Sequence, residues 1–475
     1  MRTALSTLLA VFFLGWSSHS HAQLSSSEKA AIGFTALEIK LGLAMPKGDS
    51  VSVTMVEAPE SGNYRVNTSH PSFAGKTFVF PSGGNTSAST HATIVGFYFF
   101  GVDSLAPGIG LTANGEDIAN YEANNWLGSG YLRFNISSQL PAVENRDVVN
   151  HSWIGTTGNT TLDTEIIRRF DYAIQRDDFV ATVGLNNGNS TSVPNLMAAT
   201  YNSIVVGLSN GNHSRNGTLA DGVGRTKPDI VVPTSATSWA TPTVGGAAAL
   251  LIDAARSGNL TDATRAQVVK SLLMAGASKS GSHVPFAWSN NSTHPLDPIY
   301  GAGQLNIENS YDILASGKFL ASNSTDAQHT GWDFGLTALT PRRYFFNLPF
   351  DAEFTASLTW LRIITPEDTN PLPGIYNWVF NSSLANLDLR LYQATGYTVG
   401  SLVKSSLSTV DNSELIYQNN LLAGRYVLEV TSDTAGINYG LAWQSIPEPS
   451  TWFLFLAGLA ILYNLKHRKS SPKVP

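Results

Sequence analysis

The sequence predicts an α/β fold built on a parallel sheet, followed by an antiparallel β-sandwich. Up to about residue 315, apolar runs of strand length alternate with helical stretches, a pattern typical of parallel sheets covered by helices. After about residue 320, apolar and polar residues alternate with period two between turns rich in Asn, Gly, Pro and Ser. A chain of 475 residues is long enough for both parts.

The first part is predicted to hold strands at residues 51–56, 147–150, 179–183 and 203–207. Residues 164–175 predict a helix among these strands, and residues 27–43 predict a single helix near the start of the chain. In the second part, the period-two pattern predicts strands at residues 355–363, 387–391 and 426–430.

The composition excludes several classes of function. Charged residues make up 13% of the chain and the net charge is -6, which argues against a basic surface for nucleic acid. Cysteine is absent, so the chain has no disulfide framework, no thiolate metal site and no cysteine nucleophile. The hydrophobic share of 43% is sufficient for a packed core.

The first residues, 1–22, have the organisation of a secretory signal peptide. Arg2 precedes an apolar run at 4–16, and Ser20 and Ala22 are the small residues that a signal peptidase needs. We therefore predict export, with cleavage after Ala22; a buried N-terminal helix is the alternative.

The last residues, 446–475, combine a Pro-Glu-Pro sequence, an apolar stretch at 451–465 and a basic cluster at 466–469. As a helix the apolar stretch would be about 22 Å long, shorter than the ~30 Å hydrocarbon core of a membrane. This tail resembles the PEP-CTERM signal of Gram-negative bacteria. The resemblance implies a transient inner-membrane anchor that an exosortase removes, leaving the protein at the cell surface or outside the cell. A permanent anchor is the alternative.

An apolar helix is predicted to begin near Ser238, to run to about Ala255 and to stop at Gly258. We place Pro242 in its first turn, where a missing N–H has no cost. A serine at such an N-terminus meets unpaired backbone N–H groups and the positive end of the helix dipole, as an oxyanion site requires. Taken alone, the pattern favours a plain N-cap.

The wider motif supports the catalytic interpretation. Residues 227–233 read Lys-Pro-Asp-Ile-Val-Val-Pro, and residues 237–246 read Thr-Ser-Trp-Ala-Thr-Pro-Thr-Val-Gly-Gly. Together they resemble the serine motif of the subtilases, the subtilisin-like serine peptidases of the S8 family. Ala236 stands where the family has Gly, and Trp239 stands where it has Met. The resemblance implies a subtilisin-like parallel sheet, proteolysis, and Ser238 as the nucleophile.

In that family a His accepts the serine proton and an Asp orients the imidazole. Residues 89–96, Ser-Thr-His-Ala-Thr-Ile-Val-Gly, resemble the family's histidine segment and imply that His91 is the base. Glu57 follows an apolar run where the family has its Asp, so the resemblance implies that Glu57 is the acid. Asp49 and Glu60 are the alternative acids.

The resemblance also implies an asparagine in the oxyanion hole. Residues 180–188, Val-Ala-Thr-Val-Gly-Leu-Asn-Asn-Gly, are similar to the family's strand that ends in Gly-Asn-x-Gly, and they align Asn186 with that asparagine. Asn187 takes the role if the loop is shifted by one residue. An Asn-Asn-Gly run is otherwise an ordinary turn.

Residues 148–155, Val-Val-Asn-His-Ser-Trp-Ile-Gly, resemble the family's strand that pairs with the substrate backbone. The resemblance implies that Ser152, Trp153 and Gly155 line the first specificity pocket. Subtilases often bind calcium, but no dense Asp-Gly loop marks a site here, so we predict no cofactor and no metal ligand.

Residues 301–306, Gly-Ala-Gly-Gln-Leu-Asn, resemble the segment that closes a subtilase catalytic domain, which we place at 23–320. The β-sandwich that follows, at 321–445, resembles the bacterial pre-peptidase C-terminal domain. A generic module that adheres to a polymer or acts as a spacer is the alternative. The matching runs lie at residues 356–360, 387–391 and 422–430.

Two functions therefore follow from the sequence. The first is an exported serine endopeptidase that acts on a polypeptide substrate through Ser238, His91 and Glu57. The second is a catalytically inactive surface or matrix protein that keeps the subtilase scaffold, an interpretation favoured by Trp239 and by the lack of room for an inhibitory pro-segment. We expect the distance between the Glu57 carboxylate and the His91 imidazole to discriminate between them.

Overall fold

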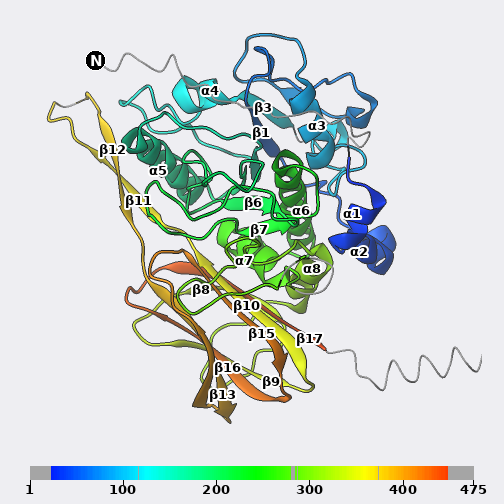
Figure 1. Ribbon diagram of the computed structural model, residues 1–475, viewed down its shortest axis with the longest axis vertical. Helices are drawn as coiled ribbons and strands as arrows, with labels where there is room; N and C mark the ends of the chain where they lie inside the picture. The colour runs from blue at the N-terminus through cyan, green and yellow to red at the C-terminus, as the bar shows by residue number, and fades with distance from the viewer. Residues whose placement is uncertain (1–22, 116, 280–283, 286, 373, 448–475) are drawn as a thin grey trace, which may run out of the picture.

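A computed structural model of the chain describes residues 23–447, apart from residues 116, 280–283, 286 and 373 (Figure 1). The predicted signal peptide and the apolar part of the predicted C-terminal tail lie outside the described residues. Within the described ranges, no helix has the length and apolar character needed to cross a membrane.

Seven parallel strands form the central sheet, in the order β2-β3-β1-β4-β5-β6-β7. Four of them confirm the predicted strands, with bounds that differ by a few residues. The pattern does not predict the short β2 and β7, nor β3, in which Asn120 and Glu122 interrupt the apolar run. The strands are β1 (Val53–Glu57), β2 (Phe78–Val79), β3 (Ile118–Glu122), β4 (Val148–His151), β5 (Val180–Gly184), β6 (Ile204–Leu208) and β7 (Ile230–Val232).

Helices cover both faces of this sheet, and each face has its own apolar core. Because successive side chains of a strand point to opposite faces, Val53 and Met55 of β1 enter one core while Val56 enters the other. This arrangement confirms the predicted α/β class. The first core contains residues of α3 (Thr90–Phe99), α6 (Thr237–Ser257), α7 (Ala266–Gly276) and α8 (Ile307–Ser316), and the second contains residues of α4 (Ala123–Asn125) and α5 (Thr160–Asp177).

The start of the described chain contains two helices where the sequence predicts one. Helix α1 (Ser26–Ala31) and helix α2 (Phe34–Leu41) are separated at Gly33, whose φ is 74°. A side chain at Gly33 would also be blocked, because a Cβ there would lie 2.4 Å from the Asn306 Oδ1 atom. The remaining helical turns are η1 (Gly42–Ala44), η2 (Pro71–Phe73), η3 (Thr112–Asn114), η4 (Trp126–Gly130) and η5 (Thr261–Thr264).

Helix α6 lies at the centre of the first core and presents its N-terminus to the carboxyl edge of the sheet. Its C-cap is Gly258, as the sequence predicts. The predicted place of Pro242 in the first turn is wrong: the helix begins at Thr237, so Pro242 lies inside it. Because proline has no N–H, the carbonyl of Ser238 receives no bond from the residue four positions on.

The second part of the chain is an antiparallel sandwich, which confirms the second half of the predicted fold. Two four-stranded sheets, ordered β15-β10-β17-β8 and β14-β13-β16-β9, enclose a third apolar core. A separate hairpin consists of β11 and β12. The strands are β8 (Gly331–Leu336), β9 (Arg342–Leu348), β10 (Ala352–Trp360), β11 (Ile363–Asp368), β12 (Trp378–Ser383), β13 (Leu387–Thr395), β14 (Thr398–Ser406), β15 (Ser413–Leu421), β16 (Gly424–Ser432) and β17 (Asn438–Pro447).

The sheet that contains β10 and β17 also packs its outer face against α7. Gln444 Nε2 donates to the carbonyl of Ala275 at 2.9 Å, and Thr359 Oγ1 donates to the carbonyl of Gln267 at 2.5 Å. Gly440 permits this close approach, because a Cβ there would lie 2.5 Å from the Gln267 carbonyl oxygen. The sandwich is therefore packed directly on the parallel-sheet part of the chain.

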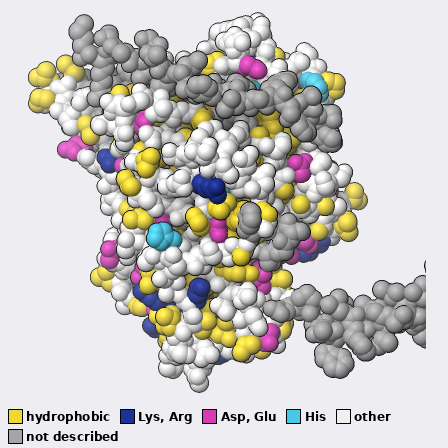
Figure 2. All heavy atoms as spheres, viewed as in Figure 1, with side chains coloured by type: hydrophobic (Ala, Val, Ile, Leu, Met, Phe, Trp, Pro, Cys, Tyr) yellow, Lys and Arg dark blue, Asp and Glu magenta, His cyan; other side chains and the backbone are white. Residues whose placement is uncertain are grey.

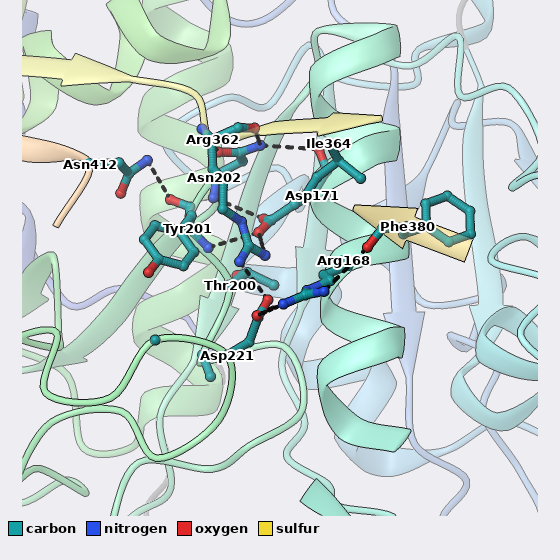
Figure 3. A network of polar contacts seen from close by, with 12 residues as sticks. Arg168, Asp171, Thr200, Tyr201, Asn202, Asp221, Arg362, Ile364, Phe380 and Asn412 are labelled. Atoms are coloured by element: carbon teal, nitrogen blue, oxygen red, sulfur yellow. Dashed lines mark hydrogen bonds and ion pairs between the residues drawn. The ribbon is translucent and has the colours of Figure 1, made fainter. Parts of the chain in front are cut away.

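A buried ion network joins the base of the β11–β12 hairpin to α5 (Figure 3). The Arg362 guanidinium contacts the carboxylates of Asp171 and Asp221, each at 2.5 Å. Asn202 Oδ1 accepts from the Arg362 N–H at 2.7 Å, and the Tyr201 ring lies 4.2 Å from the guanidinium carbon. Each charge thus has a partner, as buried charges require.

The surface contains few charges. On the face shown in Figure 2, Lys and Arg side chains are scattered among uncharged and acidic ones. This distribution agrees with the low charged fraction of the sequence, 13%.

Candidate active site

The carboxyl end of β1 and the first turn of α3 bring an acid and a base together. Glu57 is the last residue of β1 and is fully buried, and His91 is the second residue of α3. The Glu57 Oε2 atom lies 2.8 Å from the His91 Nδ1 atom, and the His91 side chain is 16% exposed. Glutamate therefore reaches the imidazole from the position that the sequence aligns with an aspartate.

Burial and charge oppose each other in this pair. Burial raises the pKa of Glu57 above its ordinary value, and the His91 imidazole opposes the rise. Burial lowers the pKa of His91, but the carboxylates of Glu57 and Glu60 outweigh burial and hold that pKa above its ordinary value. The two carboxylates thus stabilise the protonated imidazole. This is the form that a general base adopts after it has accepted a proton.

The two alternative acids take other places. Glu60 contacts the backbone at the start of α3, and Asp49 is exposed and lies beside Gly108. Of the three carboxylates considered from the sequence, Glu57 is the one that contacts the imidazole ring.

Ser238 is the second residue of α6 and is partly exposed. Its Oγ atom lies 3.5 Å from the carbonyl oxygen of Ser152. The neighbouring Trp239 ring lies 5.4 Å from the His91 ring and stacks on Tyr98 of α3 at 5.8 Å. The first turns of α3 and α6 therefore meet where the Trp239 ring lies beside the His91 imidazole. Ser238 directly precedes Trp239 in the chain.

The second of the two asparagines reaches the N-terminus of α6. Asn187 Oδ1 accepts from the Thr237 N–H at 2.9 Å, whereas Asn186 Nδ2 lies 3.4 Å from Thr191 Oγ1. Because a backbone N–H needs an acceptor, the contact assigns the oxygen of the Asn187 amide to α6 and leaves its NH₂ group as a donor. The geometry therefore favours Asn187 over Asn186 as the residue beside Ser238.

Of the segment after β4, one residue lies at the site and another lies in the apolar core. The Ser152 carbonyl faces Ser238, as described above, and Ser152 Oγ lies 3.0 Å from Asn150 Nδ2. The Trp153 side chain is 8% exposed and belongs to the core that holds α5. The Gly155 carbonyl accepts from the Leu196 N–H at 3.1 Å. Of the three predicted pocket residues, Ser152 is thus the one in contact with Ser238.

The contacts of Glu60 with the start of α3 could not be predicted from the sequence, in which Glu60 is only an alternative acid. Its carboxylate binds the start of α3 from a position 30 residues earlier in the chain. A local capping pattern gives no signal at such a separation, because it compares residues within one helical turn.

Among the described residues, no group of three or more His, Cys, Asp or Glu side chains is placed to hold a metal ion.

No protein-family model matches the chain, and no curated protein matches it by sequence. Several solved structures are similar to part of it. The patellamide maturation protease PatA has 19% identity and a TM-score of 0.37, over 56% of this chain and 97% of PatA. The PatG macrocyclase in complex with peptide has 14% identity and a TM-score of 0.39, over 59% of this chain and 95% of PatG. A lanthipeptide protease has 18% identity and a TM-score of 0.39, over 60% of this chain and 94% of that protein. Similarity of this extent carries no conclusion about activity.

Proposed function

We propose that the protein is an exported serine endopeptidase of the subtilisin type that hydrolyses peptide bonds. The observation that carries the proposal is the 2.8 Å contact between the buried Glu57 carboxylate and the His91 imidazole. This contact fixes the ring at Nδ1 and directs its Nε2 atom away from Glu57. A serine whose helix begins beside that ring is the natural nucleophile.

In this mechanism His91 accepts the Ser238 hydroxyl proton while Ser238 Oγ attacks the peptide carbonyl carbon. The imidazolium then gives the proton to the leaving amine, and an acyl-enzyme forms on Ser238. Water, deprotonated by His91, attacks the acyl carbon and releases the second product. The Glu57 carboxylate stabilises the imidazolium in both halves of the cycle.

The oxyanion would be held by two donors. The first is the Ser238 N–H, because N–H groups in the first turn of a helix have no carbonyl in a preceding turn. The second is the Asn187 NH₂ group, whose oxygen is held by the Thr237 N–H. Asn186 is the weaker candidate, since its amide is directed to Thr191.

The terminal segments support the remaining parts of the proposal. A signal peptide at 1–22 would export the chain, and a PEP-CTERM tail at 446–475 would hold it at the inner membrane until an exosortase removes the tail. The sandwich at 321–445 would serve as a pre-peptidase C-terminal type of domain.

The experiment that tests the proposal is fluorophosphonate labelling of the full chain, beside the Ser238→Ala variant. The probe reacts with an activated serine without requiring the right substrate. Labelling that is lost in Ser238→Ala supports the peptidase, and digestion of a peptide mixture read by mass spectrometry would then identify the bonds cleaved. Absence of labelling in the folded wild type would contradict catalysis and favour the inactive scaffold.

A further inference from the structure

A second carboxylate, that of Glu60, lies at the N-terminus of α3. Its Oε2 atom accepts from the Ser89 hydroxyl at 3.0 Å, from the Thr90 N–H at 2.8 Å and from the His91 N–H at 3.2 Å. Ser89 also caps the helix, since its Oγ atom accepts from the Ala92 N–H. The first turn of α3 is thus bonded to two side chains, and one bond is made to the backbone of His91.

A tight hairpin turn holds Glu60 in this place. The backbones of Glu60 and Asn63 exchange two hydrogen bonds, of 2.8 Å and 2.9 Å. The two residues between them, Ser61 and Gly62, have φ angles of 52° and 84°, as the tightest two-residue turns require. The Ser89 N–H also donates to the Arg65 carbonyl at 2.8 Å, so the chain after the turn is tied to the same helix end.

His91 is consequently bonded from two directions. Glu57 contacts its ring at Nδ1, and Glu60 accepts from its backbone N–H. We propose that Glu60 is a positioning residue that fixes the first turn of α3 and, with Glu57, sets the direction and the charge of the His91 imidazole. The proposal rests on the proposed peptidase function, in which His91 is the base.

The charges around His91 support this role. The carboxylates of Glu57 from β1 and Glu60 from the hairpin turn both raise the pKa of His91, while α6 presents the uncharged Trp239 ring to it. Glu60 also places negative charge at the positive end of the α3 dipole, where it is favourable. A single residue therefore affects both the geometry and the protonation of the imidazole.

The test compares Glu60→Gln and Glu60→Ala in the full chain, by the rate of fluorophosphonate labelling as a function of pH. Glu60→Gln keeps an acceptor oxygen and removes the charge, so we expect the acid limb to move down by about half a pH unit with little change in the plateau rate. Glu60→Ala removes the acceptor as well, and we expect its plateau rate to fall by about tenfold because the base is misplaced.

Asn159→Ala is the matched control, because Asn159 caps α5 as a side-chain acceptor for Thr161 and Leu162 N–H groups and lies outside the site. It should lower the melting temperature without changing the labelling profile. A Glu60→Ala profile that matches this control, with the plateau and the acid limb of wild type, would overturn the proposal.

A second measurement separates this inference from the peptidase proposal. Titration of the full chain labelled with ¹⁵N-histidine reports the His91 pKa directly, with the His91 signals assigned by their loss in His91→Gln. We expect Glu60→Gln to lower that pKa by about half a unit, whether or not Ser238 reacts with the probe. An unchanged His91 pKa in both Glu60 variants would overturn the role of Glu60, while unlabelled wild type would overturn the peptidase alone.

Discussion

At the scale of single residues, the replacement of the expected aspartate by Glu57 is compatible with the site. The extra methylene of glutamate could have displaced the imidazole, yet the carboxylate still lies 2.8 Å from Nδ1 of His91. The other oxygen of Glu57, Oε1, is buried and has no hydrogen-bond partner among the described residues. The pair therefore depends on one contact, which makes it sensitive to substitution.

Glu57→Gln should lower the labelling rate of Ser238 by about 10³- to 10⁴-fold, because a neutral amide neither orients nor stabilises the imidazolium. Without the carboxylate the pKa of His91 falls, so the acid limb of any residual rate should move to lower pH. The measurement is the pH profile of fluorophosphonate labelling. Glu38→Gln, an exposed acid on α2, is the control and should label as wild type does. Wild-type rates in Glu57→Gln would remove Glu57 from the mechanism.

The two asparagines can be separated in the same assay. Asn187→Ala should reduce the labelling rate by about 10²- to 10³-fold if its amide holds the oxyanion. Asn186→Ala should remain within about threefold of wild type, since its side chain is directed to Thr191 rather than to α6. A larger loss in Asn186→Ala than in Asn187→Ala would instead support Asn186, the residue that the sequence aligns with the oxyanion asparagine.

At the scale of elements, α3 packs directly against α6, and Gly245 permits this close approach. A Cβ added to Gly245 would lie 2.9 Å from Phe99 Cε2, closer than side chains tolerate, whereas one added to Gly246 would lie 3.5 Å from its nearest neighbour, Leu105 Cβ. Adjacent positions in one helix thus differ in their tolerance of a methyl group.

Gly245→Ala should destabilise the protein by about 1–3 kcal/mol, because the buried Phe99 must move. Gly246→Ala meets an ordinary contact and gains helix propensity, so it should be neutral or stabilising by up to about 1 kcal/mol. Urea unfolding of the two full-length variants measures the difference. Equal effects would show that close packing at Gly245 does not limit the approach of α3.

Strand β4 contains a second histidine with the opposite behaviour. His151 is fully buried among Trp126, Trp153 and Phe170, and neither ring nitrogen has a hydrogen-bond partner among the described residues. Burial lowers its pKa to about 3. In the unfolded chain this histidine binds a proton near pH 6.5, whereas in the folded chain it does not. The contribution of neutral His151 to the free energy of unfolding is therefore fully present above pH 6.5 and is lost as the pH falls toward 3.

His151→Phe should remove this loss, which amounts to about 3 kcal/mol between pH 7 and pH 4. The replacement also avoids two unpaired buried nitrogens, so it should not destabilise the protein at pH 7. Urea midpoints at the two pH values measure the effect. His294→Gln, on an exposed loop, is the control and should keep the acid dependence of wild type. The same dependence in His151→Phe would exclude His151 as its source.

At the scale of the whole molecule, the sandwich is joined to the parallel-sheet part by buried polar contacts. Arg362 lies between Asp171 and Asp221, and its side chain is 3% exposed. The β11–β12 hairpin packs against α5, and Phe170 of α5 lies 5.0 Å from the ring of His151 in β4, the strand that precedes Ser152. Loosening of this junction would therefore be transmitted to the scaffold of the site.

Arg362→Ala should destabilise the chain by about 3–5 kcal/mol, because it leaves the Asp171 carboxylate buried without its cation, whereas Asp221 keeps its ion pair with Arg168. Arg425→Ala is the matched control: it removes an ion pair with Asp326 at the exposed end of the sandwich and should cost about 1 kcal/mol or less. Thermal unfolding of both variants measures the effect. Equal losses of stability in the two variants would mean that the contact of Arg362 contributes little to holding the sandwich on the parallel-sheet part of the chain.

The fold class could be predicted from the amino-acid sequence, because period-two and helical patterns report which faces of each element are buried. It also identified Glu57, His91 and Ser238 as candidates, through the resemblance of their segments to the subtilase motifs. The different contacts of Asn186 and Asn187, the burial of Trp153 and the place of Pro242 inside α6 could be found only in the structure. A shift of one residue in a loop or a helix start changes side-chain direction without changing the pattern.

The carboxylates that surround His91 could be identified only from the folded chain. Glu57 and Glu60 are separated from it by 34 and 31 residues, and the folding of β1, a hairpin turn and α3 against one another brings one carboxylate to its ring and the other to its backbone N–H. Local patterns report burial and capping within a few residues. Contacts between distant segments depend on packing distances of tenths of an ångström, which a linear sequence does not express.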